Sequence, residues 1–279
     1  MSAGFPQIFD RKLYLARQQK ASAAQAPLLA HVAQDLSDRL AVINHQFASA
    51  LVIAIDPAPF CVVLDATGKF SSIATMLPPP SDHLDLGTGE HDAIFSLLDL
   101  HCVNDVPGYL VQCAKALKPD GLFMACAFAG DTLLELRNAW AAAESDVLSE
   151  ISPRVAPMIG VREMGGLLQR AGLALPVTDS DRLTLRYADA LALLREVKAF
   201  GFANPLTERR KNLTSRRVLA GLLQSYQQNN ADADGRVRAT LDLLWAMAWK
   251  PHDSQPKPKK PGSATTRLED ALKKLDNEN

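Results

Sequence analysis

Residues His91–Arg137 read HDAIFSLLDLHCVNDVPGYLVQCAKALKPDGLFMACAFAGDTLLELR and decide the fold. Asp92–Leu98 is an apolar run without alternation, which is typical of a strand covered on both faces. Val106–Leu117 carries apolar residues at helical spacing, and Lys118–Gly121 ends that helix with a proline and a glycine. Leu122–Phe128 is a second apolar run. This strand–helix–strand order predicts a parallel sheet in an α/β domain.

Further elements are predicted on both sides of this unit. Their ranges are helices at Asp10–Ala24 and Pro27–Asn44, strands at Ala50–Ile55 and Cys61–Leu64, helices at Thr132–Leu148 and Val161–Ala171, antiparallel strands at Leu173–Thr178 and Leu183–Tyr187, and helices at Ala190–Phe200, Arg216–Gln227, Val237–Ala248 and Thr265–Leu275. We therefore divide the chain into N-terminal helices (1–46), an α/β domain (47–187), a helical C-terminal region (188–250) and a Pro/Lys-rich tail (251–279).

Composition excludes several classes of protein. The net charge of −1 argues against nucleic acid as a partner. No apolar run reaches the roughly 20 residues of a transmembrane span, and the N-terminus has no apolar signal-peptide core. The four cysteines lie in apolar segments without CxxC spacing, so we expect reduced, buried thiols. Arg11, Lys12, Arg17 and Lys20 fit a solvated helix face, although such a basic N-terminus also resembles a mitochondrial transit segment.

Several motifs occur in a fixed order along the chain. They are IFDRKLYLARQQKA (Ile8–Ala21), LHCVNDVP (Leu100–Pro107), LKPDGLF (Leu117–Phe123), GDTLLELR (Gly130–Arg137), SPRVAP (Ser152–Pro157), MGGLLQRAGL (Met164–Leu173) and DGRVRATLDLLWAMAWKPHDSQPKPKKPGSA (Asp234–Ala264). Together they are similar to the family of the arginine-hydroxylating assembly factor of respiratory complex I. The segment LKPDGLF also resembles the second half of class I S-adenosylmethionine (SAM) methyltransferases.

The resemblance implies a class I SAM-methyltransferase-like, Rossmann-like fold, with SAM as the expected cofactor. It also implies a role in complex I assembly or maturation, with a complex I subunit or assembly intermediate as partner. The compartment would be the bacterial cytoplasm, or the mitochondrial matrix in a eukaryote. Three functions stay open: a family member with a degenerate SAM motif (a pseudoenzyme), an active methyltransferase on a small acid or protein side chain, and a non-catalytic scaffold.

The glycine-rich turn of a SAM site is missing from the first strand. That strand runs into Ile55-Asp56-Pro57 without a glycine, and proline removes a backbone N–H donor. Only about 35 residues separate Asp56 from Asp92, whereas two crossovers need roughly 60. We therefore expect the sheet to be incomplete in its first half. The segment His83–Glu90 (HLDLGTGE) resembles the glycine-rich turn of a SAM site. Because a strand and not a helix follows it, we interpret it as a loop.

Four residues are candidates for cofactor binding. Asp65 ends the predicted strand Cys61–Leu64, where a ribose-binding acid is expected; the alternative is a turn residue before Gly68. His101, Asn104 and Asp105 follow the strand that ends near Leu98, at the edge where α/β sheets bind ligands. Asn104 or Asp105 would otherwise cap the next helix, and Asp131 is expected to cap the helix after it.

The root of the tail carries Trp249, His252, Ser254 and Gln255, which we interpret as a pocket lid or a partner-binding anchor. The alternative is that Trp249 simply docks the tail on the body. The Pro/Lys-rich segment Pro251–Gly262 reads as extended chain able to order on a partner.

A basic run and the scattered histidines complete the candidates. The run consists of Arg209, Arg210, Lys211, Arg216 and Arg217. It fits a solvated helix face, or alternatively contact with an acidic partner or an anionic membrane surface. The histidines show no HxH or HxxxH pairing, so the sequence indicates no metal site.

Overall fold

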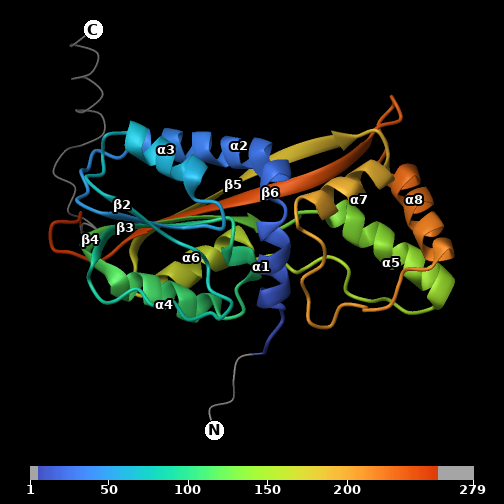
Figure 1. The fold of residues 1–279 in the computed structure, drawn as a ribbon, viewed down its shortest axis with the longest axis horizontal. Helices are drawn as coiled ribbons and strands as arrows, with labels where there is room; N and C mark the ends of the chain where they lie inside the picture. Colours follow the sequence, from blue (N-terminus) through green and yellow to red (C-terminus); the bar gives the residue numbers. More distant parts are fainter. Residues whose placement is uncertain (1–5, 257–279) are drawn as a thin grey trace, which may run out of the picture.

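The structure is a computed structural model that describes residues 6–256 (Figure 1). Its elements in chain order are α1 (Arg11–Gln19), α2 (Ser22–Ala41), β1 (Ala50–Ile53), α3 (Ala58–Ala66), β2 (Ile73–Met76), β3 (His91–Leu97), a 3₁₀ turn (Leu100–Cys102), α4 (Val106–Ala116), β4 (Leu117–Ala129), α5 (Leu134–Leu148), α6 (Val161–Arg170), β5 (Ala174–Tyr187), α7 (Ala190–Ala199), α8 (Arg216–Asn230) and β6 (Val237–Trp249).

One six-stranded sheet organises these elements in the order β2-β1-β3-β4-β6-β5. The first four strands are parallel, and β6 is antiparallel to both of its neighbours, β4 and β5. A doubly wound sheet has the order 3-2-1-4-5-6. Within residues 6–256 the outer strand of the first half is absent, and residues 77–90 form a loop between β2 and β3. The prediction of a Rossmann-like sheet that is incomplete in its first half is therefore confirmed.

Helices cover both faces of the sheet (Figure 1). On one face α2 and α3 pack on the strands, and Val32, Leu36 and Leu40 of α2 are fully buried, as the apolar stripe of the predicted second helix required. On the other face α4 and α6 pack on the same strands through Leu110 and Leu168. Because both faces are covered, the buried stretches of β3 and β4 are apolar apart from Ser96 of β3, whose hydroxyl bonds to that of Tyr109 over 2.8 Å.

Helices α5, α7 and α8 gather at the far end of the long antiparallel pair β5–β6 (Figure 1). There α5, α7 and α8 form a separate apolar cluster with the start of β6, in which Leu193, Leu222, Tyr226 and Val237 are buried. This cluster lies away from β1–β3 and close to the carboxyl end of β4, from which the chain enters α5.

Four expected elements differ from the structure. Cys61–Leu64 belongs to α3 and is not a strand, because Pro57 starts a helix directly after β1. Val237–Ala248 is strand β6 and not a helix; its apolar run is buried on both faces, and periodicity alone does not separate such a strand from a buried helix. The strands expected at 173–178 and 183–187 form one strand, β5.

The C-terminal region therefore differs from the expected division of the chain. Residues 188–250 supply α7 and α8, but they also supply β6, which lies inside the sheet between β4 and β5. The predicted helix Thr265–Leu275 and most of Pro251–Gly262 lie outside the described residues. Within the described range, no helix combines the length and the apolar character needed to cross a membrane.

Candidate functional site

The carboxyl ends of β1, β2 and β3 meet at one edge of the sheet, and helix α1 covers that edge. In α/β sheets of this kind, ligands bind where the strand order reverses, which here is between β1 and β3. Arg11 of α1 reaches into this point and donates to both carboxylate oxygens of Asp99, over 2.8 and 3.0 Å. It also donates to the carbonyl of Pro79, which follows β2, over 3.0 Å. One guanidinium thus links the segments after β2 and β3 across the end of β1.

The Arg11–Asp99 pair is almost completely withdrawn from solvent. The exposed fractions of the two side chains are 4% and 0%. Burial raises the pKa of the Asp99 carboxyl, and the neighbouring Arg11 guanidinium opposes that rise. Such a pair is stable only while both partners remain, since either charge alone would be buried without compensation.

The turn after β1 lies at the same edge of the sheet and leaves little space of its own. It runs from Ala54 to Pro57 and enters α3 at Ala58 without a glycine. The backbone N–H of Ala54 already donates to the carbonyl of Met76 over 3.2 Å, and Pro57 has no N–H to offer. The cavity at this turn has a volume of about 10 Å³, which is roughly the size of one water molecule. In this arrangement the residues present do not fit an adenosyl group.

The predicted cofactor residues occupy different surroundings. Asp65 lies on the exposed side of α3, so the argument that it ends a strand does not hold. Asp105 caps α4, accepting from the Gly108 N–H over 2.8 Å, as the alternative interpretation proposed. Asn104 accepts from the Phe9 N–H over 2.7 Å and donates to the Phe9 carbonyl over 3.2 Å. Asn104 thereby fastens the chain that leads into α1.

Asp131 does not cap α5. Its carboxylate accepts from Arg182 over 2.7 Å, and its backbone N–H donates to Asp242 over 2.9 Å. The first helical residue of α5 is Leu134, and the residue before it, Leu133, adopts a left-handed conformation without a side-chain cap. Asp131 therefore fixes the end of β4 to the antiparallel pair β5–β6.

Of the four predicted cofactor residues, His101 is the one that lies in the wall of a large cavity. Its ring is buried, and its Nε2 lies 3.4 Å from the hydroxyl of Tyr14. That hydroxyl also donates to the carbonyl of Leu98 over 3.1 Å. Burial, helped by the charge of Arg11, lowers the pKa of His101 to about 3. The imidazole is therefore neutral in the folded protein at neutral pH.

A stability profile against pH tests this assignment. The unfolded imidazole binds a proton below its ordinary pKa of 6.5, whereas the folded one does so only near 3. Stability should therefore fall as pH drops from 6.5 toward 3, by roughly 2 kcal/mol at about pH 5 from His101 alone. His101→Phe should show a shallower loss in chemical denaturation at these pH values. Equal slopes for wild type and variant would contradict a buried neutral histidine.

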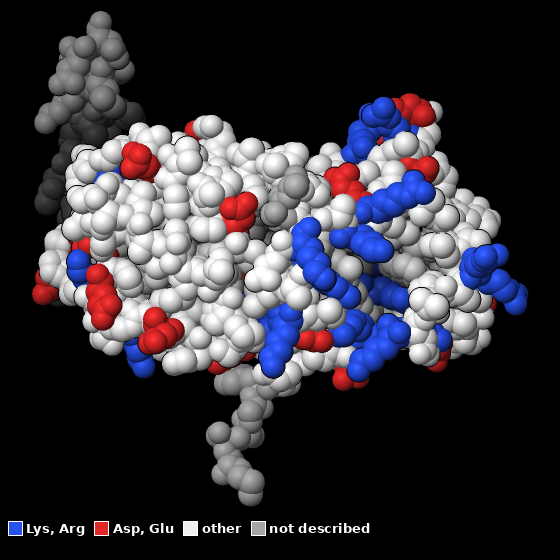
Figure 2. Space-filling model, in the orientation of Figure 1, with Lys and Arg blue, Asp and Glu red and all other residues white. Residues whose placement is uncertain are grey.

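The cavity that His101 lines has a volume of about 700 Å³, within the range of small-molecule sites. It lies between α1, the end of β4, α5, α7 and the chain from Phe200 to Lys211. Its apolar wall includes Phe128, Leu136, Trp140, Leu193, Val197 and Phe202. Its basic residues are Arg17, Lys20, Arg154, Lys198, Arg209, Arg210 and Lys211, against the single acid Glu196. Figure 2 shows Lys and Arg side chains gathered around the hollow on this face.

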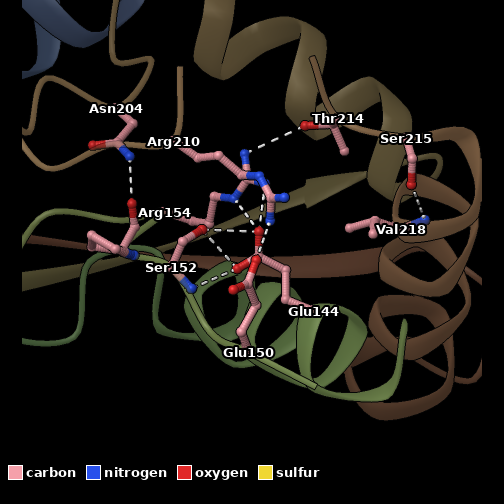
Figure 3. A network of polar contacts seen from close by, with 10 residues as sticks. Glu144, Glu150, Ser152, Arg154, Asn204, Arg210, Thr214, Ser215 and Val218 are labelled. Atoms are coloured by element: carbon pink, nitrogen blue, oxygen red, sulfur yellow. Dashed lines mark hydrogen bonds and ion pairs between the residues drawn. The ribbon is translucent and has the colours of Figure 1, made fainter. Parts of the chain in front are cut away.

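A buried carboxylate organises one side of this cavity (Figure 3). Glu144 of α5 is fully buried and accepts from the N–H and hydroxyl of Ser152, each over 2.8 Å, and from the Arg154 guanidinium. Although burial alone would raise it, these hydrogen bonds hold the pKa of Glu144 below its ordinary value. Arg154 also lies over the Trp140 ring, 4.5 Å from its centroid. The motif SPRVAP (Ser152–Pro157) therefore forms part of the cavity wall, and Glu144 of α5 holds it in place.

The basic run divides between two places. Arg209, Arg210 and Lys211 line the cavity, where Arg209 pairs with Asp10 over 3.2 Å. Arg216 and Arg217 open α8 and are exposed, as a solvated helix face requires.

Trp249 lies on the body of the protein, at the end of β6. Its ring stacks on Phe47 with centroids 6.3 Å apart and meets His45 edge-on at 5.8 Å. Gln255 donates to Asp120 over 2.8 Å and so holds the start of the tail beside the first residues of β4. His252 and Ser254 bond to each other on the surface. These contacts agree with docking of the tail root by Trp249, while a partner role for the four residues stays a prediction.

Three residues of the covered edge were missed by the sequence reasoning. Arg11 was assigned to a solvated helix face but is buried, and Asp99 and Tyr14 were not singled out. An acid inside the apolar run LLDLH was the available signal for Asp99, since a buried carboxylate needs a partner. Across residues 6–256, no group of three His, Cys, Asp or Glu side chains is arranged to hold a metal ion.

Comparisons with known proteins place this geometry in context. No protein-family model matches the chain. The mouse protein named "Arginine-hydroxylase NDUFAF5, mitochondrial" is 32% identical over 291 residues, covering 95% of this chain and 84% of the relative. The malonyl-[acyl-carrier protein] O-methyltransferase of Xylella fastidiosa is 35% identical over 210 residues, covering 75% and 69%. The solved structure of YcgJ from Bacillus subtilis superposes with a TM-score of 0.51 at 11% identity, covering 80% of this chain and 99% of that one, and shares its fold.

Proposed function

Because this chain belongs to the SAM-methyltransferase-like family of the arginine hydroxylase NDUFAF5, we propose that it acts in respiratory complex I assembly or maturation without using SAM. In this proposal the protein binds a complex I subunit or assembly intermediate through its surface and tail. Its place of action is the cytoplasm of a bacterium, or the mitochondrial matrix of a eukaryote. The class I fold then serves as a rigid scaffold.

The single observation that carries this proposal is the buried ion pair of Arg11 and Asp99. It lies at the reversal of the strand order, where an adenosyl group would have to enter. Opening this edge would expose or separate two buried charges, which is costly. The glycine-free turn from Ala54 to Pro57 adds a second obstacle, because it offers no close backbone approach to the ligand.

The second candidate function is an active methyltransferase on a small acid. The basic mouth of the large cavity favours it, since Lys20, Lys198 and Lys211 would attract a carboxylate substrate. A cationic substrate such as an arginine side chain would be repelled by the same mouth. This candidate requires SAM to bind beside the cavity, so cofactor binding decides between the two functions.

Isothermal titration calorimetry with SAM and with S-adenosylhomocysteine tests the proposal. We expect no heat of binding for the intact protein up to millimolar ligand. Micromolar affinity for either ligand would overturn the proposal and support the methyltransferase. In that event Asp65→Ala should weaken binding if Asp65 holds the ribose, and Asp56→Ala, at a half-buried acid of the first turn, serves as the comparison.

A further inference from the structure

The large cavity is separate from the closed edge of the sheet and has its own chemistry. Its inner wall is apolar, built mainly by Phe128 of β4, Trp140 of α5, Val197 of α7 and Phe202 beyond α7. Such a wall gains free energy by covering apolar surface of a ligand. Among the polar groups of the lining, the Tyr14 hydroxyl donates to the Leu98 carbonyl, whereas the buried Nδ1 of His101 has no hydrogen-bond partner within residues 6–256.

The charges at the mouth are only partly compensated within the protein. Arg154, Arg209 and Arg210 pair with carboxylates, at Glu144, Asp10 and Glu150. By contrast, no ion pair within residues 6–256 engages Lys20, Lys198 or Lys211, and all three side chains are exposed.

Arg17 is a further cation in the cavity wall. Its guanidinium donates to the carbonyls of Ala203 and Asn204, over 2.7 and 2.9 Å, and so keeps a full positive charge. Partial burial and the neighbouring Arg209 charge lower the pKa of Arg17, as expected where cations are crowded. An anion at the mouth would relieve this repulsion.

We propose that the cavity binds an amphipathic anion, with an acyl chain of fatty-acid length in the apolar interior and a carboxylate or phosphate headgroup at the basic mouth. The apolar depth and the cationic rim lie within one cavity, which is the arrangement such a molecule requires. An acidic peptide would instead bury backbone amides against Phe128 and Trp140 without hydrogen bonds, at a cost of a few kcal/mol for each group. The inference does not depend on SAM or on complex I.

Fluorescence titration with 11-(dansylamino)undecanoic acid provides the direct test. We expect micromolar binding to the full chain that weakens as salt rises, because exposed lysines supply the headgroup attraction. Competition with palmitate and with lysophosphatidic acid then distinguishes a carboxylate from a phosphate headgroup. Palmitic acid methyl ester, which has the same chain but no charge, should compete roughly tenfold less well. Equal competition by the ester, or no probe binding, would overturn the inference.

Two variants localise the site. Lys20→Glu/Lys198→Glu reverses two exposed charges at the mouth and should weaken probe binding roughly tenfold or more. Lys12→Glu is the matched control, because Lys12 is an exposed lysine of the same helix that does not line the cavity. Val197→Trp should reduce binding by filling the interior, with a thermal melt confirming that the variant folds. Equal affinities for the double variant and the Lys12 control would place the ligand elsewhere.

Discussion

Replacing Arg11 by alanine is expected to lower the free energy of unfolding by about 3–5 kcal/mol. The change leaves the Asp99 carboxylate, whose side chain is 0% exposed, without its guanidinium partner. It also removes the hydrogen bond to the Pro79 carbonyl that joins the loop after β2 to α1. Chemical denaturation of the two proteins, followed by circular dichroism, measures the difference. Lys12→Ala, one residue along the same helix and exposed, should stay within roughly 0.5 kcal/mol of wild type.

A double variant separates the loss of the pair from the loss of packing. Replacing both partners of a buried ion pair by apolar residues of similar volume is often nearly neutral. Arg11→Met/Asp99→Leu should therefore be more stable than Arg11→Ala, by an amount that reflects the uncompensated charge. If the double variant were as unstable as the single one, burial of an unpaired Asp99 would not be the cause. If Arg11→Ala cost less than about 1 kcal/mol, the pair would not hold the edge closed.

The parts of the fold that could be predicted are those with an unambiguous local pattern. The β3–α4–β4 unit follows from two apolar runs on either side of a helical period with clear end signals. The missing outer strand followed from chain length, because the residues between Asp56 and Asp92 are too few for two full crossovers. Both inferences use geometry that any sequence of this fold must satisfy.

The errors came from runs whose pattern fits two structures. Val237–Trp249 is apolar at nearly every position, so it reads equally as a buried helix or a buried strand. Its place between β4 and β5 is set by pairing with residues more than 100 positions earlier, such as Leu122 opposite Trp249. Cys61–Leu64 has strand-like side chains, but Pro57 and the packing of Phe60 on α2 make it helical.

The candidate site depended still more on distant contacts. Arg11 and Asp99 are 88 positions apart, and nothing local to either residue indicates the other. The charge pattern of α1 fitted a solvated face because Lys12 and Lys20 are indeed exposed, while Arg11 on the same helix turns inward. The cavity likewise is lined by side chains from α1, β4, α5 and α7. Its volume and its positive charge therefore depend on how these elements pack, and the sequence alone does not predict them.

Removing Pro251–Asn279 is expected to leave the body folded and to abolish association with a complex I subunit or assembly intermediate. The last strand, β6, ends at Trp249, so the sheet stays complete in the shortened chain. The described contacts that are lost at the root of the tail include those of Gln255 with Asp120 and the Lys250 carbonyl. A Pro/Lys-rich sequence can order on a partner, so the loss of this one should remove most of the binding energy. Pull-down with complex I subunits measures association, and thermal melts measure folding.

The variant Trp249→Ala tests whether Trp249 binds the partner or only docks the tail on the body of the protein. The Trp249 ring stacks on Phe47 and meets His45, so the variant should lose roughly 2–3 kcal/mol of stability from this half-buried packing. If Trp249 also places the tail for the partner, the variant should lose much of the association at temperatures where it remains folded. Full association by the folded variant would confine Trp249 to docking. If the shortened chain still associated with the partner to the same extent, residues 251–279 would not form part of the partner interface.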